Sequence, residues 1–182
     1  MGPVKSRSHL WIWAPVALNA LLYLTYRDWN LWCFRWVEWL GASAPVRAWR
    51  GFAGEFGTPP EFVRYSLASG LWLLGVGCAL LWIWGPTRRG FGLLGALLLG
   101  CWATEAAQAA GLMVGTADWS DVFAYAAGAV GAALRFGRPD RARGRNDQAA
   151  GGRIAAPHLA SLAFVGGALL LATGAVPGTL WP

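Results

Sequence analysis

Four polar side chains stand in a stretch of sequence that is otherwise almost wholly apolar or small. They are Glu105, Gln108, Asp118 and Asp121, all within residues 100–132. Ionisable groups in sequence of this character are costly to bury, so they usually face a bundle interior or a water-filled cavity and mark a functional site. Carboxylates and an amide offer hydrogen-bond acceptance, proton transfer or cation binding. If the chain has a chemical centre, this stretch holds it.

Glu105 and Gln108 are three residues apart and share one face of a helix. If that helix ends near Met113, a rise of about 1.5 Å per residue places Glu105 roughly 12 Å from the end, close to the middle of a bilayer. A carboxylate at that depth either finds a partner or stays protonated through desolvation. The candidates are Gln108, Thr104, an arginine such as Arg27, or a bound cation, and the sequence does not choose among them.

Asp118 and Asp121 have two interpretations. An Asp at the N-cap with an acid three residues later satisfies free N–H groups and suits the positive end of a helix, which predicts a purely structural pair. The same two carboxylates at a helix start are also suited to a ligand or substrate. One residue of the pair can serve each purpose, so both interpretations stay open.

The composition predicts the elements that must position these groups. Of 182 residues, 56% are hydrophobic, 13% are charged and thirteen are tryptophan, which concentrates at membrane–water interfaces. These values indicate an all-α, polytopic integral membrane bundle rather than an ordinary soluble domain. The net charge of +6 sits in short loops between apolar runs, where it sets topology and contacts anionic lipid. No nucleic-acid-binding module accompanies it, so no nucleic acid is expected as a partner.

Cofactors are not expected. The three cysteines, Cys33, Cys78 and Cys101, are too scattered for a disulfide framework and suit apolar packing. The chain has two histidines and no paired Cys or His spacing, which argues against zinc or haem. A cation site made of carboxylates alone stays open.

The apolar runs predict about five transmembrane helices in a single membrane domain, residues 1–182. The expected spans are about 10–26, 65–84, 91–113, 119–136 and 158–176. Trp29, Trp32, Trp36 and Trp39 recur at spacings of three and four, which predicts an interfacial amphipathic helix over about 29–49, with a packed loop as the alternative. A basic loop over about 137–157 is expected on the cytoplasmic side.

The distribution of lysine and arginine predicts orientation. With the N-terminus in the cytoplasm, ten of the fifteen basic residues fall on the cytoplasmic side, which favours N-inside and C-outside topology. Asp118 and Asp121 then face the outside. The five remaining basic residues fall in the first, outward loop: Arg27, Arg35, Arg47, Arg50 and Arg64.

Small residues repeat every four positions on two of the expected helices. One set is Ala103, Ala107 and Gly111, and the other is Ala124, Gly128 and Ala132. Small residues at this spacing let helix backbones approach closely. We expect the two helices to pack as a tight hairpin that presents Glu105 and Asp121 toward a common cleft.

This region resembles the VanZ-like family of small bacterial integral membrane proteins. The family pattern is a Glu, a Gln three residues on, a Gly-Arg pair, an Asp-rich turn, then an Asn and a Gly-rich helix. The matching positions are Glu105, Gln108, Gly115, Asp118, Asp121, Gly128 and Gly131. Two positions depart, because Thr116 stands where the family often has Arg and Tyr125 where it has Asn. The resemblance implies a location in the bacterial inner membrane. We expect a ligand-binding set of Glu105, Gln108, Asp118, Asp121 and Tyr125.

Three functions follow as hypotheses. The first is a VanZ-like envelope protein that binds an amphipathic envelope molecule, such as a lipid-linked precursor or a lipophilic antibiotic, near the outer leaflet. The second is a structural or assembly subunit of a larger membrane protein complex, whose small-residue faces and tryptophans contact partner helices. The third is a lipid-processing enzyme in which Glu105 or Asp121 serves as general base or holds a divalent cation. A transporter is disfavoured because no inverted repeat is visible.

Overall fold

The computed structural model describes residues 5–29, 32–113 and 116–136. All regular structure in these ranges is α-helical. The elements in chain order are α1 (Lys5–Tyr26), α2 (Trp32–Trp39), α3 (Ser43–Glu55), α4 (Glu61–Arg64), α5 (Ser66–Trp84), α6 (Arg88–Ala109) and α7 (Trp119–Phe136). The basic loop expected over 137–157 and the span expected over 158–176 lie outside the described residues.

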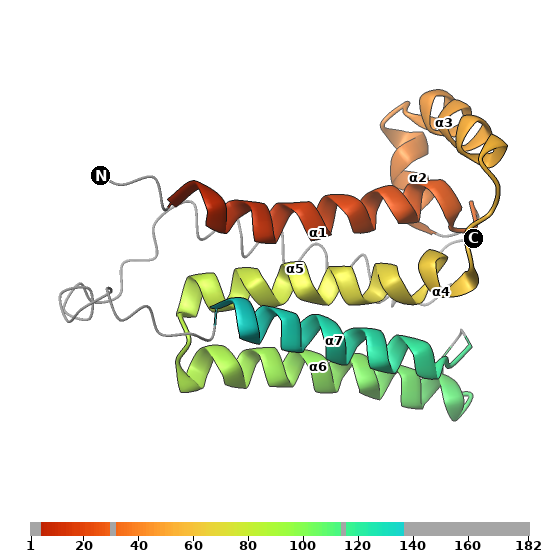
Figure 1. Cartoon of the computed structure of the whole chain (residues 1–182). Helices are drawn as coiled ribbons and strands as arrows, with labels where there is room; N and C mark the ends of the chain where they lie inside the picture. The colour runs from red at the N-terminus through yellow and green to blue at the C-terminus, as the bar shows by residue number, and fades with distance from the viewer. Residues whose placement is uncertain (1–4, 30–31, 114–115, 137–182) are drawn as a thin grey trace.

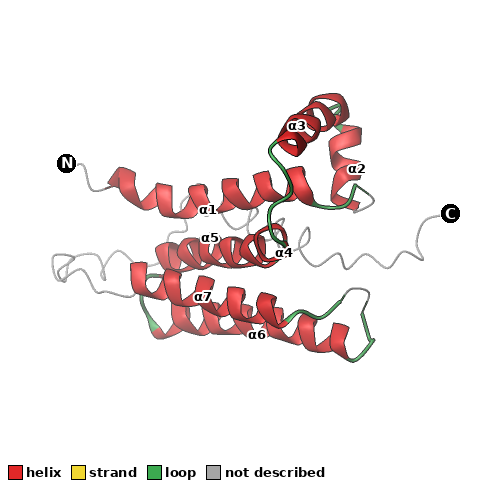
Figure 2. Ribbon diagram, turned by 45° about the vertical axis from the view of Figure 1, so that its right-hand side comes forward, coloured by secondary structure: helices red, strands yellow, loops and turns green. Residues whose placement is uncertain are grey.

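Four long helices lie side by side, and three short ones gather at one end. Helices α1, α5, α6 and α7 run along a common direction, while α2, α3 and α4 cluster where α1 ends (Figure 1). The end of α6 and the start of α7 lie at this same end of the bundle, as the turned view also shows (Figure 2). The segments that carry the carboxylates of interest and the arginines of residues 27–64 are therefore at one end of the molecule.

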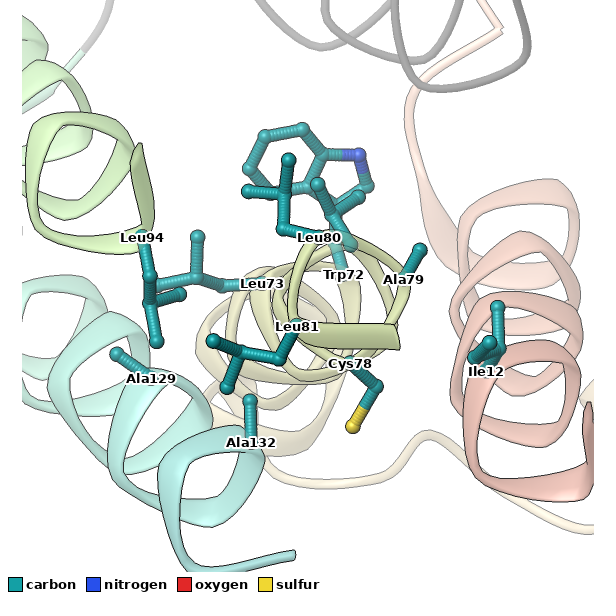
Figure 3. Close-up of a cluster of buried hydrophobic side chains, with 11 residues drawn as sticks. Ile12, Trp72, Leu73, Cys78, Ala79, Leu80, Leu81, Leu94, Ala129 and Ala132 are labelled. Carbon is teal, nitrogen blue, oxygen red and sulfur yellow. The ribbon is translucent and has the colours of Figure 1, made fainter. Parts of the chain in front are cut away.

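Helix α5 is the centre of the packing. It contacts α7 most extensively, then α1, and also α6. Its side chains Leu73, Val76 and Leu81 are almost fully buried. Figure 3 shows α5 between Ile12 of α1 on one side and Leu94 and Ala132 of α6 and α7 on the other. Because α5 is apolar around its whole circumference, it suits this fully surrounded position.

Glycines set how closely α7 approaches α5. A Cβ placed on Gly128 would overlap the Gly70 carbonyl oxygen, and one on Gly70 would lie 2.8 Å from the Ala124 carbonyl oxygen. A Cβ on Gly77 would lie 2.9 Å from side chains of both Ala132 and Leu94. Small residues on both helices thus permit near backbone contact.

The small-residue face of α7 was expected to pack on the small residues of α6, and this expectation is wrong. Ala124, Gly128 and Ala132 are buried against α5, rather than against the small residues of α6. On α6, Ala103 is exposed, and Gly111 lies beyond the helix with open space around its Cα. The spacing identified the packing face of α7 correctly, but α5 carries glycines that match it more closely.

The segment expected as one interfacial helix over 29–49 forms two helices, α2 and α3. Gly41 ends α2 with φ +69°, and two backbone hydrogen bonds close the turn: Gly41 N–H to the Glu38 carbonyl and Ala42 N–H to the Val37 carbonyl. This is the Schellman arrangement, which glycine favours because it has no Cβ to clash at positive φ. Trp39 on α2 is 81% exposed, whereas Trp29 precedes the helix and stacks on Phe34.

Helix α6 ends at Ala109, four residues before the expected boundary at Met113. The same Schellman arrangement is responsible, since Gly111 has φ +69° and Leu112 N–H bonds to the Ala107 carbonyl. Helix α1 begins at Lys5, earlier than the expected residue 10, and α7 has the expected bounds. A short helix, α4, precedes the expected start of α5, with Tyr65 between them.

Within the described ranges, two helical segments are long and apolar enough to cross a membrane by length and composition. They are Glu61–Trp84, which joins α4 and α5, and Arg88–Ala109. The first is mostly buried inside the bundle, and the second is mostly exposed on its surface. Helices α1 and α7, two of the other expected spans, lie beside them but do not meet the same criterion.

Candidate functional site

Glu105 bonds to the start of the next long helix. Its side chain is only 7% exposed, and its Oε2 accepts a hydrogen bond from the Asp118 backbone N–H across 3.2 Å. Asp118 immediately precedes α7, where backbone N–H groups lack partners within the helix. Glu105 therefore supplies from α6 an acceptor that α7 needs. This partner was absent from the four candidates that the sequence suggested.

Glu105 lies closer to the end of its helix than expected. Because α6 ends at Ala109, Glu105 is one turn from that end, at about 6 Å along the axis rather than 12 Å. The early end follows from Gly111, which the sequence reading placed inside the packing face. Glu105 is consequently part of the polar end of the bundle and not of its middle.

Asp118 caps α7, as one of its two interpretations predicted. Its Oδ1 accepts the Ser120 backbone N–H at 2.8 Å, which is the N-cap bond to the second helical residue. Hydrogen bonds from the Ser120 side chain and from this N–H lower the pKa of the Asp118 carboxyl below its ordinary value. The carboxylate is exposed and stays charged near neutral pH.

A chain of hydroxyl groups connects this cap to α5. Ser66, which is fully buried, lies 2.6 Å from the Ser120 hydroxyl. A hydroxyl has one proton to donate. Either hydroxyl of this pair can be the donor. The first turn of α5, the cap of α7 and Glu105 of α6 are thereby joined in one polar cluster, Ser66, Glu105, Asp118, Ser120 and Asp121.

In the polar cluster, the Asp121 side chain has a carboxylate oxygen that accepts no hydrogen bond from any described residue. Its Oδ1 is buried and has no hydrogen-bond donor within the described part of the chain. Its backbone N–H bonds to the Asp118 carbonyl at 3.0 Å, so the residue is held in the first turn of α7. Asp118 and Asp121 both interact electrostatically with Glu105. An uncompensated carboxylate oxygen at this position can accept a hydrogen bond from a hydroxyl or ammonium group.

Tyr125 lies one turn along α7 from Asp121. It is half-buried, its side chain hydrogen-bonds with Ser69 of α5, and Glu105 and Asp121 are among its electrostatic neighbours. Gln108 is also half-buried but makes no side-chain hydrogen bond to Glu105 or to any other described residue. The structure thus brings Glu105, Asp118, Asp121 and Tyr125 together and leaves Gln108 beside them.

The sequence reading missed the three serines, Ser66, Ser69 and Ser120. Their signal is present in the sequence: Ser66 and Ser69 occupy the first turn of an apolar helix, and Ser120 lies between the two aspartates. Hydroxyls at such positions bond to helix ends or to neighbouring helices. Serine is difficult to identify as a site residue from sequence, because it carries no charge and is common on protein surfaces.

Among the residues that the structure describes, no group of three His, Cys, Asp or Glu side chains is arranged to hold a metal ion. The polar cluster holds three carboxylates, but one bonds to a backbone N–H and another caps a helix. Two of these groups therefore already have structural partners. The catalytic hypothesis that uses a divalent cation gains no support from this geometry.

Comparisons with known proteins bring no further assignment. No protein-family model matches the chain, and no curated protein or solved structure matches it either.

Proposed function

We propose that this chain is a VanZ-like protein of the bacterial inner membrane that binds an amphipathic envelope molecule at the polar end of its helical bundle. A lipid-linked precursor and a lipophilic antibiotic are the two chemical types considered. The observation that carries the proposal is the buried, unpaired Oδ1 of Asp121. A buried acceptor without a donor is destabilising by about 1–3 kcal/mol, so a ligand that donates to it is stabilised there.

The surroundings of Asp121 favour a ligand with both polar and apolar parts. On the polar side are the exposed Asp118 carboxylate and the half-buried Tyr125. On the apolar side are exposed Trp119 and Phe123, neighbours of Asp121 on α7, which are 78% and 71% exposed. A membrane location accounts for these exposed aromatic rings. With the N-terminus in the cytoplasm, this end of the bundle faces the outer leaflet.

Native mass spectrometry after purification in mild detergent tests the proposal. We expect wild type to retain a small amphiphile and Asp121→Asn to retain much less of it, because a neutral amide oxygen is a weaker acceptor than a carboxylate oxygen. Glu55→Gln is the matched control, since Glu55 is an exposed carboxylate at the end of α3. An amphiphile that is retained equally by Asp121→Asn would contradict the proposal.

An assembly subunit is the second candidate, and one observation favours it. Most of α6 is exposed, and Gly92, Gly95 and Gly100 have open space where a Cβ would be. Large apolar side chains flank these glycines, including Leu99, which is 63% exposed. Such a surface allows close approach of another helix as well as contact with lipid. Co-purification of a stoichiometric protein partner, lost in Gly95→Leu, would favour this candidate over ligand binding.

A further inference from the structure

Three arginines from different helices meet at the end of α1. Arg27 follows α1, Arg50 is in α3 and Arg64 ends α4. The guanidinium carbons of Arg27 and Arg64 lie 4.5 Å and 5.1 Å from the centroid of the same ring, that of Tyr65. Arg50 joins them through its Nη2, which donates to the Arg27 carbonyl at 2.8 Å. Residues far apart in sequence thus bring three arginines to the end of α1.

Each of the three guanidinium groups has an inward N–H without an acceptor. Arg27 Nε, Arg50 Nη1 and Arg64 Nε are all buried and lack a hydrogen-bond partner in the described part of the chain. Glu61 is a carboxylate 3.8 Å from Arg64, and its side chain is 86% exposed. An exposed pair of this kind contributes little. Three unsatisfied charged donors on neighbouring segments suit an anion with several acceptor oxygens.

Aromatic rings hold these guanidinium planes in position. Arg27 also lies over Tyr23 at 4.8 Å, and Arg50 lies over Phe34 at 5.5 Å. A ring face attracts the cation while leaving the N–H edge free to bond elsewhere. Guanidinium edges presented in this way bind phosphate oxygens in pairs, with geometry that lysine does not provide.

An apolar groove lies between α1 and α3, beside the arginines. It has a volume of about 260 Å³ and is lined by Leu21, Leu24, Pro45, Val46 and Trp49. Leu24 is three residues from Arg27 and Val46 is four from Arg50, so each pair shares a helix face. The Trp49 Nε1–H donates to Thr25 at 2.8 Å, which fixes the indole against α1. Arg27 and Arg50 therefore lie about one helical turn beyond the groove residues Leu24 and Val46.

We propose that Arg27, Arg50 and Arg64 bind the phosphate of a membrane lipid whose acyl chain occupies the groove between α1 and α3. The site is separate from the polar cluster around Asp121 and shares with the proposed function only the membrane location. The choice of a lipid over free phosphate rests on the apolar groove, because inorganic phosphate gains nothing from those side chains. The five arginines of the first loop do not follow the positive-inside pattern. Lipid binding accounts for three of them.

Binding of dioctanoyl phosphatidic acid to the purified full chain in dodecylmaltoside tests the proposal by native mass spectrometry. We expect the triple variant Arg27→Gln, Arg50→Gln, Arg64→Gln to weaken binding at least about tenfold, since it removes the charge-assisted hydrogen bonds to the phosphate. The control is Arg35→Gln, Arg88→Gln, Arg89→Gln, which removes the same formal charge from exposed arginines and should bind as wild type does. If both triple variants weaken lipid binding equally, the loss of net charge explains the effect, and the proposed phosphate site is wrong.

A second variant leaves every arginine in place and guards against misfolding of the triple variant. Val46→Trp fills the groove, so lipid binding should fall while inorganic phosphate binding is unchanged. Dioctanoylglycerol, which has the chains but no phosphate, should not bind. Inorganic phosphate that binds as tightly as the lipid, or lipid binding unaffected by Val46→Trp, would overturn the lipid assignment. The Asp121→Asn variant should bind phosphatidic acid as wild type does. A failure of the lipid-phosphate proposal can therefore be distinguished from a failure of the proposed function.

Discussion

The Glu105 carboxylate on α6 accepts the backbone N–H of Asp118 at the start of α7 across 3.2 Å. One side chain thus connects two helices at the loop that joins them. The loop contains Gly111, whose positive φ ends α6 early and turns the chain. Glu105 is buried, so its bond is formed where competition from water is reduced.

Replacing Glu105 should separate the role of the acceptor from that of the charge. Glu105→Ala removes the acceptor, and we expect a loss of about 1–3 kcal/mol in the free energy of unfolding. Glu105→Gln keeps a carbonyl oxygen that can accept the Asp118 N–H, so it should lose less. Thermal unfolding in detergent measures both. Equal losses would indicate that the bond to Asp118 contributes little.

The cap formed by Asp118 should depend on pH. Because its pKa is lowered in the folded protein, the carboxylate stabilises the fold above the unfolded-state pKa of about 3.9, and this contribution is lost as the pH falls through the folded-state pKa. Asp118→Ala has neither cap nor charge. The difference in unfolding temperature between wild type and this variant should therefore shrink below about pH 4. A difference that is constant from neutral pH to acid would exclude this linkage.

The Ser66–Ser120 contact should show energetic coupling between α5 and α7. The two oxygens are 2.6 Å apart, and Ser66 is fully buried. A double-mutant cycle with Ser66→Ala and Ser120→Ala should give a coupling of about 0.5–1.5 kcal/mol. Strict additivity of the two changes would show that the hydroxyls do not depend on one another.

Gly128 should tolerate no larger side chain. A Cβ there overlaps the Gly70 carbonyl, which belongs to backbone and cannot rotate away. We expect Gly128→Ala to destabilise the protein by about 1–3 kcal/mol through overpacking. Gly92→Ala is the matched control, because that glycine is helical and has open space around it. A similar unfolding temperature for the two variants would mean that α5 and α7 can move apart without cost.

The all-helical class was predictable because apolar runs of helical length are a strong local signal. The start of α7 was predictable too, since an Asp before an apolar run has a direct physical meaning as a cap. The partner of Glu105 was not, because it is a backbone N–H thirteen residues away, and every residue type offers the same group. Charged or amide side chains attract attention in a sequence, while main-chain donors do not.

Packing partners were harder to predict than packing faces. The small-residue spacing on α7 correctly marked its buried side, yet spacing alone does not say which of two candidate helices it meets. Gly70 and Gly77 on α5 decided the outcome through backbone proximity. The arginine cluster was likewise hidden, because Arg27, Arg50 and Arg64 come together only when α1, α3 and α4 meet at one end.

The central position of α5 has a consequence for how the chain is made. Synthesis delivers α5 long before α7, whose Ala124, Gly128 and Ala132 fill the notches beside Gly70 and Gly77. Until α7 is made, this most enclosed helix of the finished bundle packs only on α1, α4 and α6, and the surface that α7 will cover is unfilled. A ribosome stalled within the loop after α6 would therefore leave an incomplete protein with this surface of α5 exposed. The exposed surface distinguishes the incomplete protein from the mature one. It gives cellular quality control a structural feature to recognise.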